Sequence, residues 1–464
     1  MKIAALFLAL AAMACITPMS EENHMLAITH VTVVDVTGAP SQSDMTILTS
    51  GERITSILPS FDARIPKTAQ VIDGKGGWLI PGLWDMHVHA HREGRTPSFY
   101  PLFVAHGVTG VREMGSHLAS LLAWRQAWKN DSMAPRVIWS TPMFDGDPPI
   151  WRHGLAVETP EAGRALVRNM KASGFDFVKI YSKLSRDVYF AIADEAKKDS
   201  IPFAGHVPFL ITPAEASRAG QRSIEHMTGV LESCIPGALE QAAESISPEK
   251  ARLRMDELLN RSKSSDYREA SQKLFSEFVS DGTWLVPTLV TARGATFVDD
   301  DSFAQDARLV YVLPHIRKRW EEYKHSLKPE DAAIGRRYTQ RMVELAGELY
   351  RAKVGLLAGT DASDEPWVFA GSSLHDELEL LAQAGLTPLA ALQTATLNAA
   401  KFLGKTETMG TIGPGKSADL VLLDADPLAD IRNTKKIRAV VLRGRYLDRL
   451  ALDGLLAEAR ALAK

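Results

Sequence analysis

Cysteine is nearly absent from this chain of 464 residues, which has only Cys15 and Cys234. A disulfide framework is therefore excluded, and any metal site must use His, carboxylate or Lys ligands. Neither sign of charge is in excess, because 53 Lys and Arg face 56 Asp and Glu, which gives a net charge of −3. No basic surface for nucleic acid is indicated. With 45% hydrophobic residues, the chain has the composition of an ordinary globular protein with a large core.

The apolar run at the N-terminus is too short to span a bilayer stably. Lys2 precedes the apolar residues Ile3 to Ala11, and the small residues of Ala12-Met13-Ala14 follow. This pattern predicts a signal peptide within residues 1–19. Cys15 leaves a second interpretation open, a bacterial lipoprotein signal that ends at Cys15 with lipid on that cysteine. We therefore expect a secreted or periplasmic protein, attached to a membrane only if Cys15 carries lipid.

Two separated segments have the pattern of β-strands. In residues 25–80, LAITHVTVVDV and MTILTSGERITSILPS alternate β-branched and polar residues, and turn residues divide the runs. Similar runs, SADLVLLDADP and IRAVVLRGRYLD, return within residues 405–450. The pattern predicts a small antiparallel unit at the start of the chain, completed into a composite β-sandwich by strands from both ends.

The middle of the chain, residues 81–404, alternates short apolar runs with amphipathic helices such as Arg186–Lys198 and Pro213–Gly220. Eight strands are expected: Leu83–His89, Val108–Gly115, Arg136–Phe144, Phe177–Ser182, Pro202–Pro208, Arg222–Met227, Thr283–Val290 and Val354–Ala362. Eight such repeats predict an α/β fold of the (β/α)8 TIM barrel type. An open doubly wound sheet is the alternative, but no Gly-rich dinucleotide loop follows a strand. The helical segments 228–281 and 291–353 follow strands six and seven and would flank the catalytic face.

Six side chains with metal-binding chemistry stand at or near the ends of these strands. His87 and His89 alternate with Val88, so they project to one side of their strand. The others are Lys179, His206, His226 and Asp361. Each alone has an ordinary interpretation: a core histidine, a helix cap or a strand-edge lysine. In a barrel, however, catalytic groups gather at the C-terminal ends of strands, and all six meet that requirement.

Lys179 lies between Val178 and Ile180 in an apolar strand. A free ammonium would be costly to bury there without a partner. A neutral lysine can instead react with carbon dioxide to form a carbamate, an anionic group with two oxygens that can bridge two metal ions.

The motifs PGLWDMHVH, GVTGVREMG, FVKIYS, GHVP, SIEHM, LLAGTDA, LTPLAALQTATLNAAKFLG and GTIGPGKSADLVLLDADP resemble those of the amidohydrolase superfamily. The likeness extends from about Met25 to Leu447. It is greatest to secreted members related to imidazolonepropionase and to Xaa-Pro dipeptidases. Imidazolonepropionase and the deaminases use one metal and lack the lysine of strand four, so Lys179 favours the dipeptidase-like branch.

The resemblance implies two divalent metal ions, usually zinc. His87 and His89 would hold one ion with Asp361, and His206 and His226 would hold the other. A carbamate on Lys179 and a hydroxide would bridge them. Asp361 would act as general acid and base while the hydroxide attacks an amide carbonyl.

The expected substrate is a small molecule, a dipeptide or an N-acyl amino acid, whose C–N amide bond is cleaved. Tyr181, His153 and His375 are the candidates for substrate binding, because they follow the strands on the catalytic side. Two alternatives remain open: hydrolysis of a cyclic amide, lactone or xenobiotic amide or ester, and a non-catalytic binding protein with this fold. Oligomerisation is left open.

Overall fold

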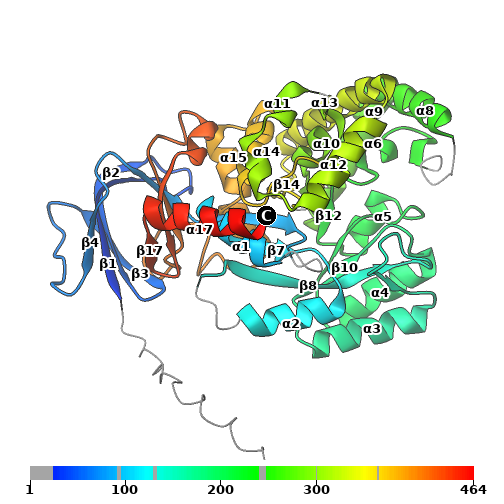
Figure 1. The fold of residues 1–464 in the computed structure, drawn as a ribbon. Coiled ribbons are helices and arrows are strands. Elements are labelled where there is room, and N and C mark those ends of the chain that lie inside the picture. The colour runs from blue at the N-terminus through cyan, green and yellow to red at the C-terminus, as the bar shows by residue number, and fades with distance from the viewer. Residues whose placement is uncertain (1–23, 91–95, 129–132, 240–246, 299, 363–364) are drawn as a thin grey trace, which may run out of the picture.

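The computed structural model describes residues 24–90, 96–128, 133–239, 247–298, 300–362 and 365–464 (Figure 1). The expected signal peptide and Cys15 lie outside these ranges, so the structure does not test the predicted signal peptide or the lipid on Cys15. Within the described ranges, no helix combines the length and the apolar character needed to cross a membrane. Cys234 is buried and carries a free thiol.

All eight predicted barrel strands are present. They pair side by side in the order β14-β13-β12-β11-β10-β8-β7-β6, and every pair among them is parallel. The bounds are β6 (Leu83–Val88), β7 (Val108–Glu113), β8 (Arg136–Asp145), β10 (Phe177–Ile180), β11 (Phe203–Gly205), β12 (Ser223–Glu225), β13 (Trp284–Val286) and β14 (Gly355–Leu356). A short strand, β9 (Leu155–Ala156), adds to β8.

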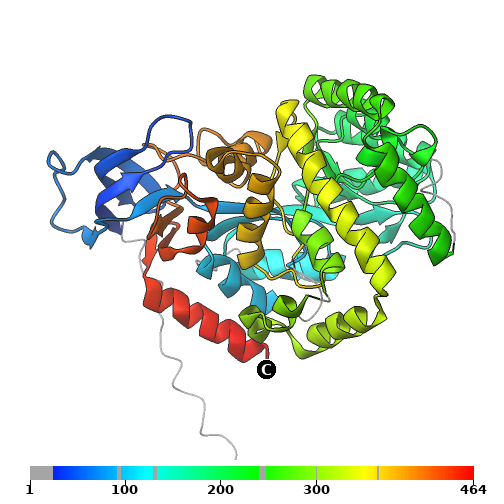
Figure 2. The same cartoon turned by 90° about the horizontal axis from the view of Figure 1, so that it is seen from above.

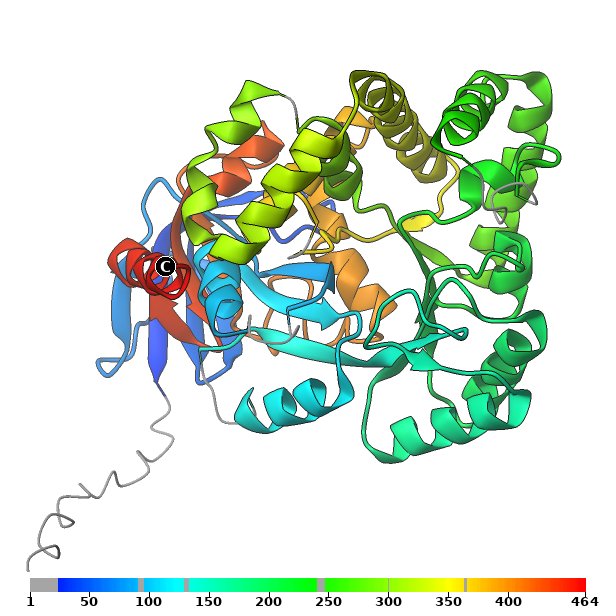
Figure 3. The ribbon, with the colours of Figure 1, turned by 45° about the vertical axis from the view of Figure 1, so that its right-hand side comes forward.

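The barrel closes between its first and last strands. Val88 and Ala362 form a parallel bridge, and the amide of Asp361 donates to the His87 carbonyl at 2.7 Å. The curled sheet and its surrounding helices are visible in Figure 3. This closure brings the end of the eighth strand directly beside the two histidines of the first.

The two barrel helices whose bounds were predicted are both present, and the second, α5 (Pro213–Arg218), ends two residues before the predicted Gly220. Helix α4 (Arg186–Lys198) has the expected bounds, and the Ser185 side chain caps it by accepting from the Val188 amide. Val188, Ile192 and Ala196 are spaced by four residues, so they form the buried stripe that packs on the sheet. The other barrel helices are α1 (Thr96–Ala105), α2 (Leu118–Trp128), α3 (Pro160–Ala172), α5 (Pro213–Arg218), α14 (Ser372–Gln383), α15 (Pro388–Thr394) and α16 (Leu397–Phe402).

The two long segments after β12 and β13 are helical, as predicted. The first holds α6 (Val230–Ser233), α8 (Pro248–Arg261) and α9 (Ser265–Asp281). The second holds α10 (Leu289–Thr296), α11 (Asp301–Ala304), η1 (Ala307–Tyr311), α12 (Pro314–Ser326) and α13 (Pro329–Arg351). Helix α13, the long yellow helix in Figure 2, packs against both α8 and α10. The segments therefore form one helical layer.

Strands from both ends of the chain form a second sheet, seen at the left of Figure 1. It contains β1 (Met25–Val33), β2 (Gln42–Ser50), β3 (Arg53–Pro59), β4 (Gln70–Asp73), β5 (Trp78–Pro81), β15 (Leu420–Leu423), β16 (Ile437–Leu442) and β17 (Arg445–Leu447). The predicted antiparallel pairing holds between β1, β2 and β3 and between β15, β16 and β17, whereas β1 pairs in parallel with β4 and with β5. Strand β5 then pairs antiparallel with β15, which joins the two ends. The terminal helix α17 (Arg449–Leu462) packs on α1.

Candidate metal centre

The histidines of the first strand are held by one ring nitrogen each. Every residue of β6 is buried. The Nδ1 of His87 lies 2.6 Å from Oε2 of Glu225, and the Nδ1 of His89 lies 2.8 Å from the carbonyl oxygen of Gly115. Carbonyl and carboxylate oxygens only accept, so both Nδ1 atoms donate. The Nε2 atoms are thereby left with lone pairs.

The histidines after β11 and β12 are held in a similar way. The Nδ1 of His226 lies 2.7 Å from the Thr288 hydroxyl, which itself donates to the carbonyl of Pro287. The Nδ1 of His206 lies 2.9 Å from the Ser182 hydroxyl. The ring centroid of His226 is 4.6 Å from that of His87 and 4.8 Å from that of His206. The four imidazoles thus form one cluster.

Asp361 faces three of these rings. Its Oδ1 is 3.2 Å from Nε2 of His89 and 3.3 Å from Nε2 of His87, while its Oδ2 is 3.9 Å from Nε2 of His226. One ligand atom from each of His87, His226 and Asp361 lies within 4.8 Å of the others. Lone pairs of imidazole and carboxylate therefore face one another, an arrangement that a cation between them would stabilise.

The turn that carries Asp361 is fixed by a residue that the sequence interpretation missed. Buried Asp85 accepts from the hydroxyl of Thr360 at 2.6 Å and from its amide at 3.0 Å. Asp361 itself has a positive φ of 59°. Gly359 is required here by close approach, because a Cβ atom on it would lie 2.8 Å from the Cβ of His87.

Lys179 lies on β10 and its side chain is fully buried. Its backbone amide donates to the Thr141 hydroxyl, and its Nζ lies 5.8 Å from the ring centroid of Tyr181. The Tyr181 ring in turn lies 4.1 Å from the ring of His206, so Lys179 stands beside the histidine cluster. The structure therefore brings together all six predicted ligands.

The protonation states suit a metal ion. Burial lowers the pKa of His226 to about 3, although the charge of Asp361 opposes this, and burial also holds the pKa of His206 well below its usual value. Both rings are neutral at neutral pH. Burial alone would raise the pKa of Asp361, but His87 and His226 hold it well below its usual value. Neutral imidazoles and a carboxylate are the ligands of a zinc-type ion.

Whether these residues fit a metal ion is tested most clearly by the Nε2 atom of His87. This atom is buried and has no hydrogen-bond partner, although a buried ring nitrogen normally has one. A metal ion at this position would satisfy it. The residues present therefore fit a divalent ion.

A cavity of about 320 Å³ opens beside this centre. Its lining comprises His89, Trp151, Tyr181, His206, His226, Pro287, Thr288, Leu289, Thr291, Ala292, Ala295, Tyr338, Met342, Asp361 and Glu365. One wall, from the start of α10 to α13, is largely apolar. No lysine or arginine is among the described lining residues.

Of the residues predicted to bind substrate, Tyr181 lines the cavity and His153 does not. The indole Nε1 of Trp151 donates to the Tyr181 hydroxyl at 2.7 Å, and the Tyr181 ring lies 4.1 Å from that of His206. His153 accepts at Nε2 from the Nε of Arg152, one residue before it.

The prediction that His375 contacts substrate is wrong. His375 is buried on α14, where its Nδ1 pairs with the Thr434 hydroxyl and its Nε2 with the carbonyl of His106. Both ring nitrogens are thus occupied by bonds that join α14 to the C-terminal part and to α1. A helix that begins near the barrel mouth can point its side chains inward, which the sequence could not reveal.

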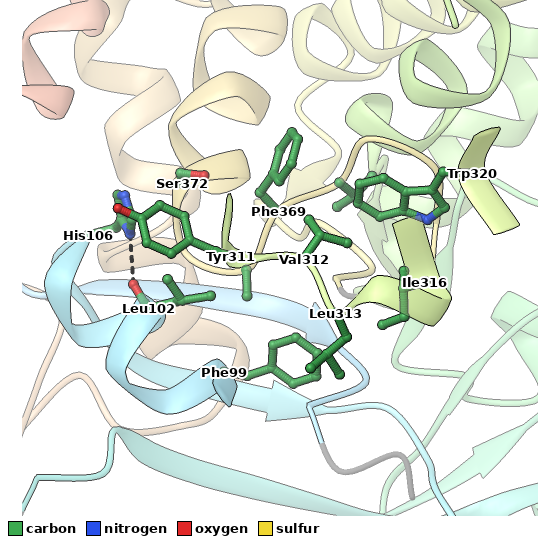
Figure 4. Close-up of a pocket in the computed structure, with 12 residues that line it drawn as sticks. Phe99, Leu102, His106, Tyr311, Val312, Leu313, Ile316, Trp320, Phe369 and Ser372 are labelled. Carbon is green, nitrogen blue, oxygen red and sulfur yellow. Dashed lines mark hydrogen bonds between the residues drawn. The ribbon is translucent and has the colours of Figure 1, made fainter. Parts of the chain in front are cut away.

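A separate small cavity of about 20 Å³ lies nearby, between α1, η1 and α12 (Figure 4). Phe99, Leu102, Val312, Ile316 and Trp320 are among the apolar residues around it. Its volume leaves room for little more than one water molecule. It forms part of the packing rather than a substrate site.

Glu225 and Arg112 were also missed by the sequence interpretation. Arg112 donates from Nη2 to Glu225 at 2.9 Å, and both side chains are fully or nearly fully buried. Burial alone would raise the pKa of Glu225, but Arg112 and His87 hold it well below its usual range. The available signal was a glutamate within an apolar strand, in SIEHM, which must have a partner.

Residues 78–447 match the model of the Amidohydrolase family. The chain belongs to the amidohydrolase family. The family is one of hydrolases acting on carbon–nitrogen bonds. An imidazolonepropionase of Pyrobaculum arsenaticum is 44% identical to this amidohydrolase over 78 residues, which are 17% of this chain and 19% of that relative.

Solved structures resemble this amidohydrolase over almost its whole length. A bottromycin amidohydrolase has a TM-score of 0.73 at 23% identity and covers 95% of this chain and 90% of its own. A Xaa-Pro dipeptidase with methionine bound in its active site has a TM-score of 0.66 at 19% identity, over 91% of this chain and 100% of its own. At these identities the likeness establishes the fold.

Proposed function

We propose that this amidohydrolase is a metal-dependent enzyme that cleaves a C–N amide bond of a small molecule. The observation that carries the proposal is the set of imidazole Nε2 atoms and the Asp361 carboxylate that face one another beside a cavity. The fixed Nδ1 contacts of His87, His89 and His226 support metal binding rather than a purely structural cluster.

His87, His89 and Asp361 would hold one ion, His206 and His226 a second, and a carbamate on Lys179 would lie between them. When bound, such ions activate water as a nucleophile and polarise a carbonyl. The burial of Lys179 supports the carbamate, because burial favours the neutral amine that reacts with carbon dioxide.

The chain's own groups would move the proton. Asp361 is a carboxylate at the cavity, so it can accept a proton from the attacking water and transfer it to the departing nitrogen. Tyr181 lines the cavity and accepts a hydrogen bond from Trp151, so its hydroxyl is placed where it can contact a substrate oxygen. The helical layer of α10 and α13 supplies the apolar wall that excludes water.

The first candidate substrate is a dipeptide or N-acyl amino acid with an apolar side chain. The wall of Pro287, Leu289 and Met342 would receive that side chain. Tyr181 would contact the carboxylate. His153, two residues after the Trp151 that donates to Tyr181, is a further candidate. The Xaa-Pro dipeptidase similarity is consistent with this candidate.

A second candidate is an amide or ester without a carboxylate, such as a cyclic amide, a lactone or a xenobiotic amide. It is favoured by the lack of lysine and arginine among the described residues that line the cavity. Among the described residues that line the cavity, a free carboxylate would find no lysine or arginine to pair with.

The deciding experiment compares matched substrates on zinc-loaded protein that lacks residues 1–19. N-acetyl-L-phenylalanine, Leu-Pro and Phe-Ala would be compared with N-acetyl-L-phenylalanine amide, an anilide and a lactone, with metal content measured on the same sample. Turnover only of the carboxylates supports the first candidate, and turnover only of the neutral compounds supports the second. If the protein holds metal but turns over none of them, the proposed amide hydrolysis is wrong.

A further inference from the structure

A buried network below the metal centre carries an inference about how one ligand is prepared. Glu225, on β12, accepts four hydrogen bonds from three groups: Nδ1 of His87, the hydroxyl of Ser223, and Nη2 of Arg112, which contacts both carboxylate oxygens. The distances run from 2.5 to 2.9 Å. Its side chain is fully buried, so these contacts define its position without help from solvent.

Arg112 holds this carboxylate and the His87 backbone together. Its Nε donates to the carbonyl of Met86 at 2.6 Å, one residue before His87, and its Nη1 donates to the Ser223 hydroxyl at 2.9 Å. The rings of Phe177 and Phe402 lie 5.6 and 5.0 Å from its guanidinium carbon. These contacts hold the arginine in place, and the arginine in turn holds Glu225.

The consequence is a single tautomer for His87. A carboxylate can only accept from Nδ1, so the proton stays there and the lone pair of Nε2 points to Asp361 and the proposed metal. Glu225→Gln changes the hydrogen bonding at this position, because a glutamine side chain has an acceptor oxygen and a donor NH2 group, whereas a carboxylate only accepts. Arg112 and Ser223 both donate, so they would attract the amide oxygen and leave the amide NH2 toward His87. That arrangement favours a proton on Nε2, where it competes with the ion.

We infer that Glu225 is a positioning residue for the metal centre, locked by Arg112, that fixes the His87 tautomer and so sets the affinity for the ion. This inference rests on the proposed function, because it assumes that His87 is a metal ligand. A carboxylate that accepts from a metal-bound histidine also makes the ring a stronger donor. Loss of such a partner costs about 10–100-fold in metal affinity in other proteins.

The test measures zinc dissociation constants by competition with a chromogenic chelator, for the full chain and for Glu225→Gln. We expect Glu225→Gln to bind the zinc ion held by His87 about 10–100-fold less tightly. The visible spectrum of the cobalt(II)-loaded variant should also change, because the donor strength of a ligand changes. Neither readout depends on turnover. Ser223→Ala removes one donor to Glu225 and should weaken zinc binding less.

Glu195→Gln is the matched control. Glu195 is also a buried glutamate bound by arginines, Arg164 and Arg168, but it lies on α4 away from the metal centre. It should change stability without changing zinc affinity. Zinc affinity within twofold of wild type in both Glu225→Gln and Ser223→Ala would overturn the inference. A wild-type protein that binds no zinc would instead refute the proposed function.

Discussion

At the scale of single residues, Asp361 has a backbone conformation that few residues adopt. The neighbouring His87 and His226 also hold the pKa of its carboxyl well below the usual value. Its φ of 59° lies in the left-handed region, where aspartate and asparagine are the commonest non-glycine residues. Asparagine can therefore replace it without new backbone strain. The substitution removes the charge alone, which makes it a clean probe of the carboxylate.

We predict that Asp361→Asn lowers kcat at least about 100-fold, because the proton acceptor and an anionic ligand are both lost. The metal-free protein should lose stability as well, because the depressed pKa of Asp361 means that its charged form stabilises the folded state. Turnover and calorimetry on the same preparations would check this. Retained turnover with retained metal would remove Asp361 from catalysis.

Gly359 permits a second prediction at this scale. Gly359→Ala should weaken metal binding and destabilise the fold by about 1–3 kcal/mol, because its Cβ would press on the backbone and Cβ of His87. The control is Gly454→Ala on α17, where no atom lies within 4 Å of the added Cβ. That change should instead stabilise by about 0.5–1 kcal/mol. Unfolding midpoints and zinc titration of both variants decide the matter.

The sequence was sufficient to locate the residues of the imidazole cluster but insufficient to show which residues hold them in place. His87, His206 and His226 could be found because each stands at the end of an apolar run in a recognisable motif. Asp85 and Arg112 could not, because their partners Thr360 and Glu225 lie more than 100 residues away and only barrel closure brings them together. His375 was misassigned because its position near the mouth says nothing about the direction of its ring.

At the scale of elements, the strand pattern predicted the barrel well, since each βα repeat has its own period and turn. Helix α4 even has its predicted bounds, which the Ser185 cap and the stripe of Val188 and Ile192 explain. In the smaller sheet, alternation located the strands but not their partners. A period of two is the same for parallel and antiparallel strands, so the parallel pairing of β1 with β4 was not foreseeable.

Asp376 joins four elements through charge, and this gives a prediction about pH. It lies on α14 and pairs with Arg308 of η1, Arg293 of α10 and Lys435 of the 3₁₀ helix η2 (Ile431–Lys435). Burial alone would raise the pKa of Asp376, but these three cations hold it well below its usual range. A depressed carboxylate pKa contributes stability above the unfolded value of about 4 and loses it as the pH falls further.

Asp376→Asn should therefore lower the stability at pH 7 by about 2 kcal/mol, a value discounted because the cations are partly exposed. The difference in unfolding free energy between Asp376→Asn and wild type should become smaller as the pH falls below about 4. Thermal unfolding at several pH values would measure it. Asp453→Asn, in an exposed pair with Arg449, should change stability by less than about 0.5 kcal/mol at every pH. If the stability difference between Asp376→Asn and wild type is constant down to pH 3, the pKa of Asp376 is not depressed as described.

At the scale of the whole molecule, the chain passes directly from the composite sheet into the barrel sheet. Only Gly82 separates β5 of the composite sheet from β6 of the barrel, and its amide donates to the carbonyl of Asp419 at 2.8 Å. Arg136, at the start of β8, pairs with Asp419 and with Glu52 of the composite sheet. The first strand of the barrel thus begins inside the other sheet, and neither sheet can separate without breaking these bonds.

This continuity predicts how metal removal acts on the chain. An ion that binds only the folded state adds about 2.7 kcal/mol when its free concentration is 100 times its dissociation constant. Because β5 and β6 are one strand path, the ion should stabilise the composite sheet as well as the barrel. Stripping the protein with a chelator should therefore lower the midpoint of a single unfolding transition, and added zinc should restore it. Hydrogen exchange on β2 and β16 would report the distant sheet, with Gly454→Ala as a variant whose zinc response should be unchanged. Two separate transitions, with only the barrel sensitive to zinc, would show that the shared strand does not couple the sheets.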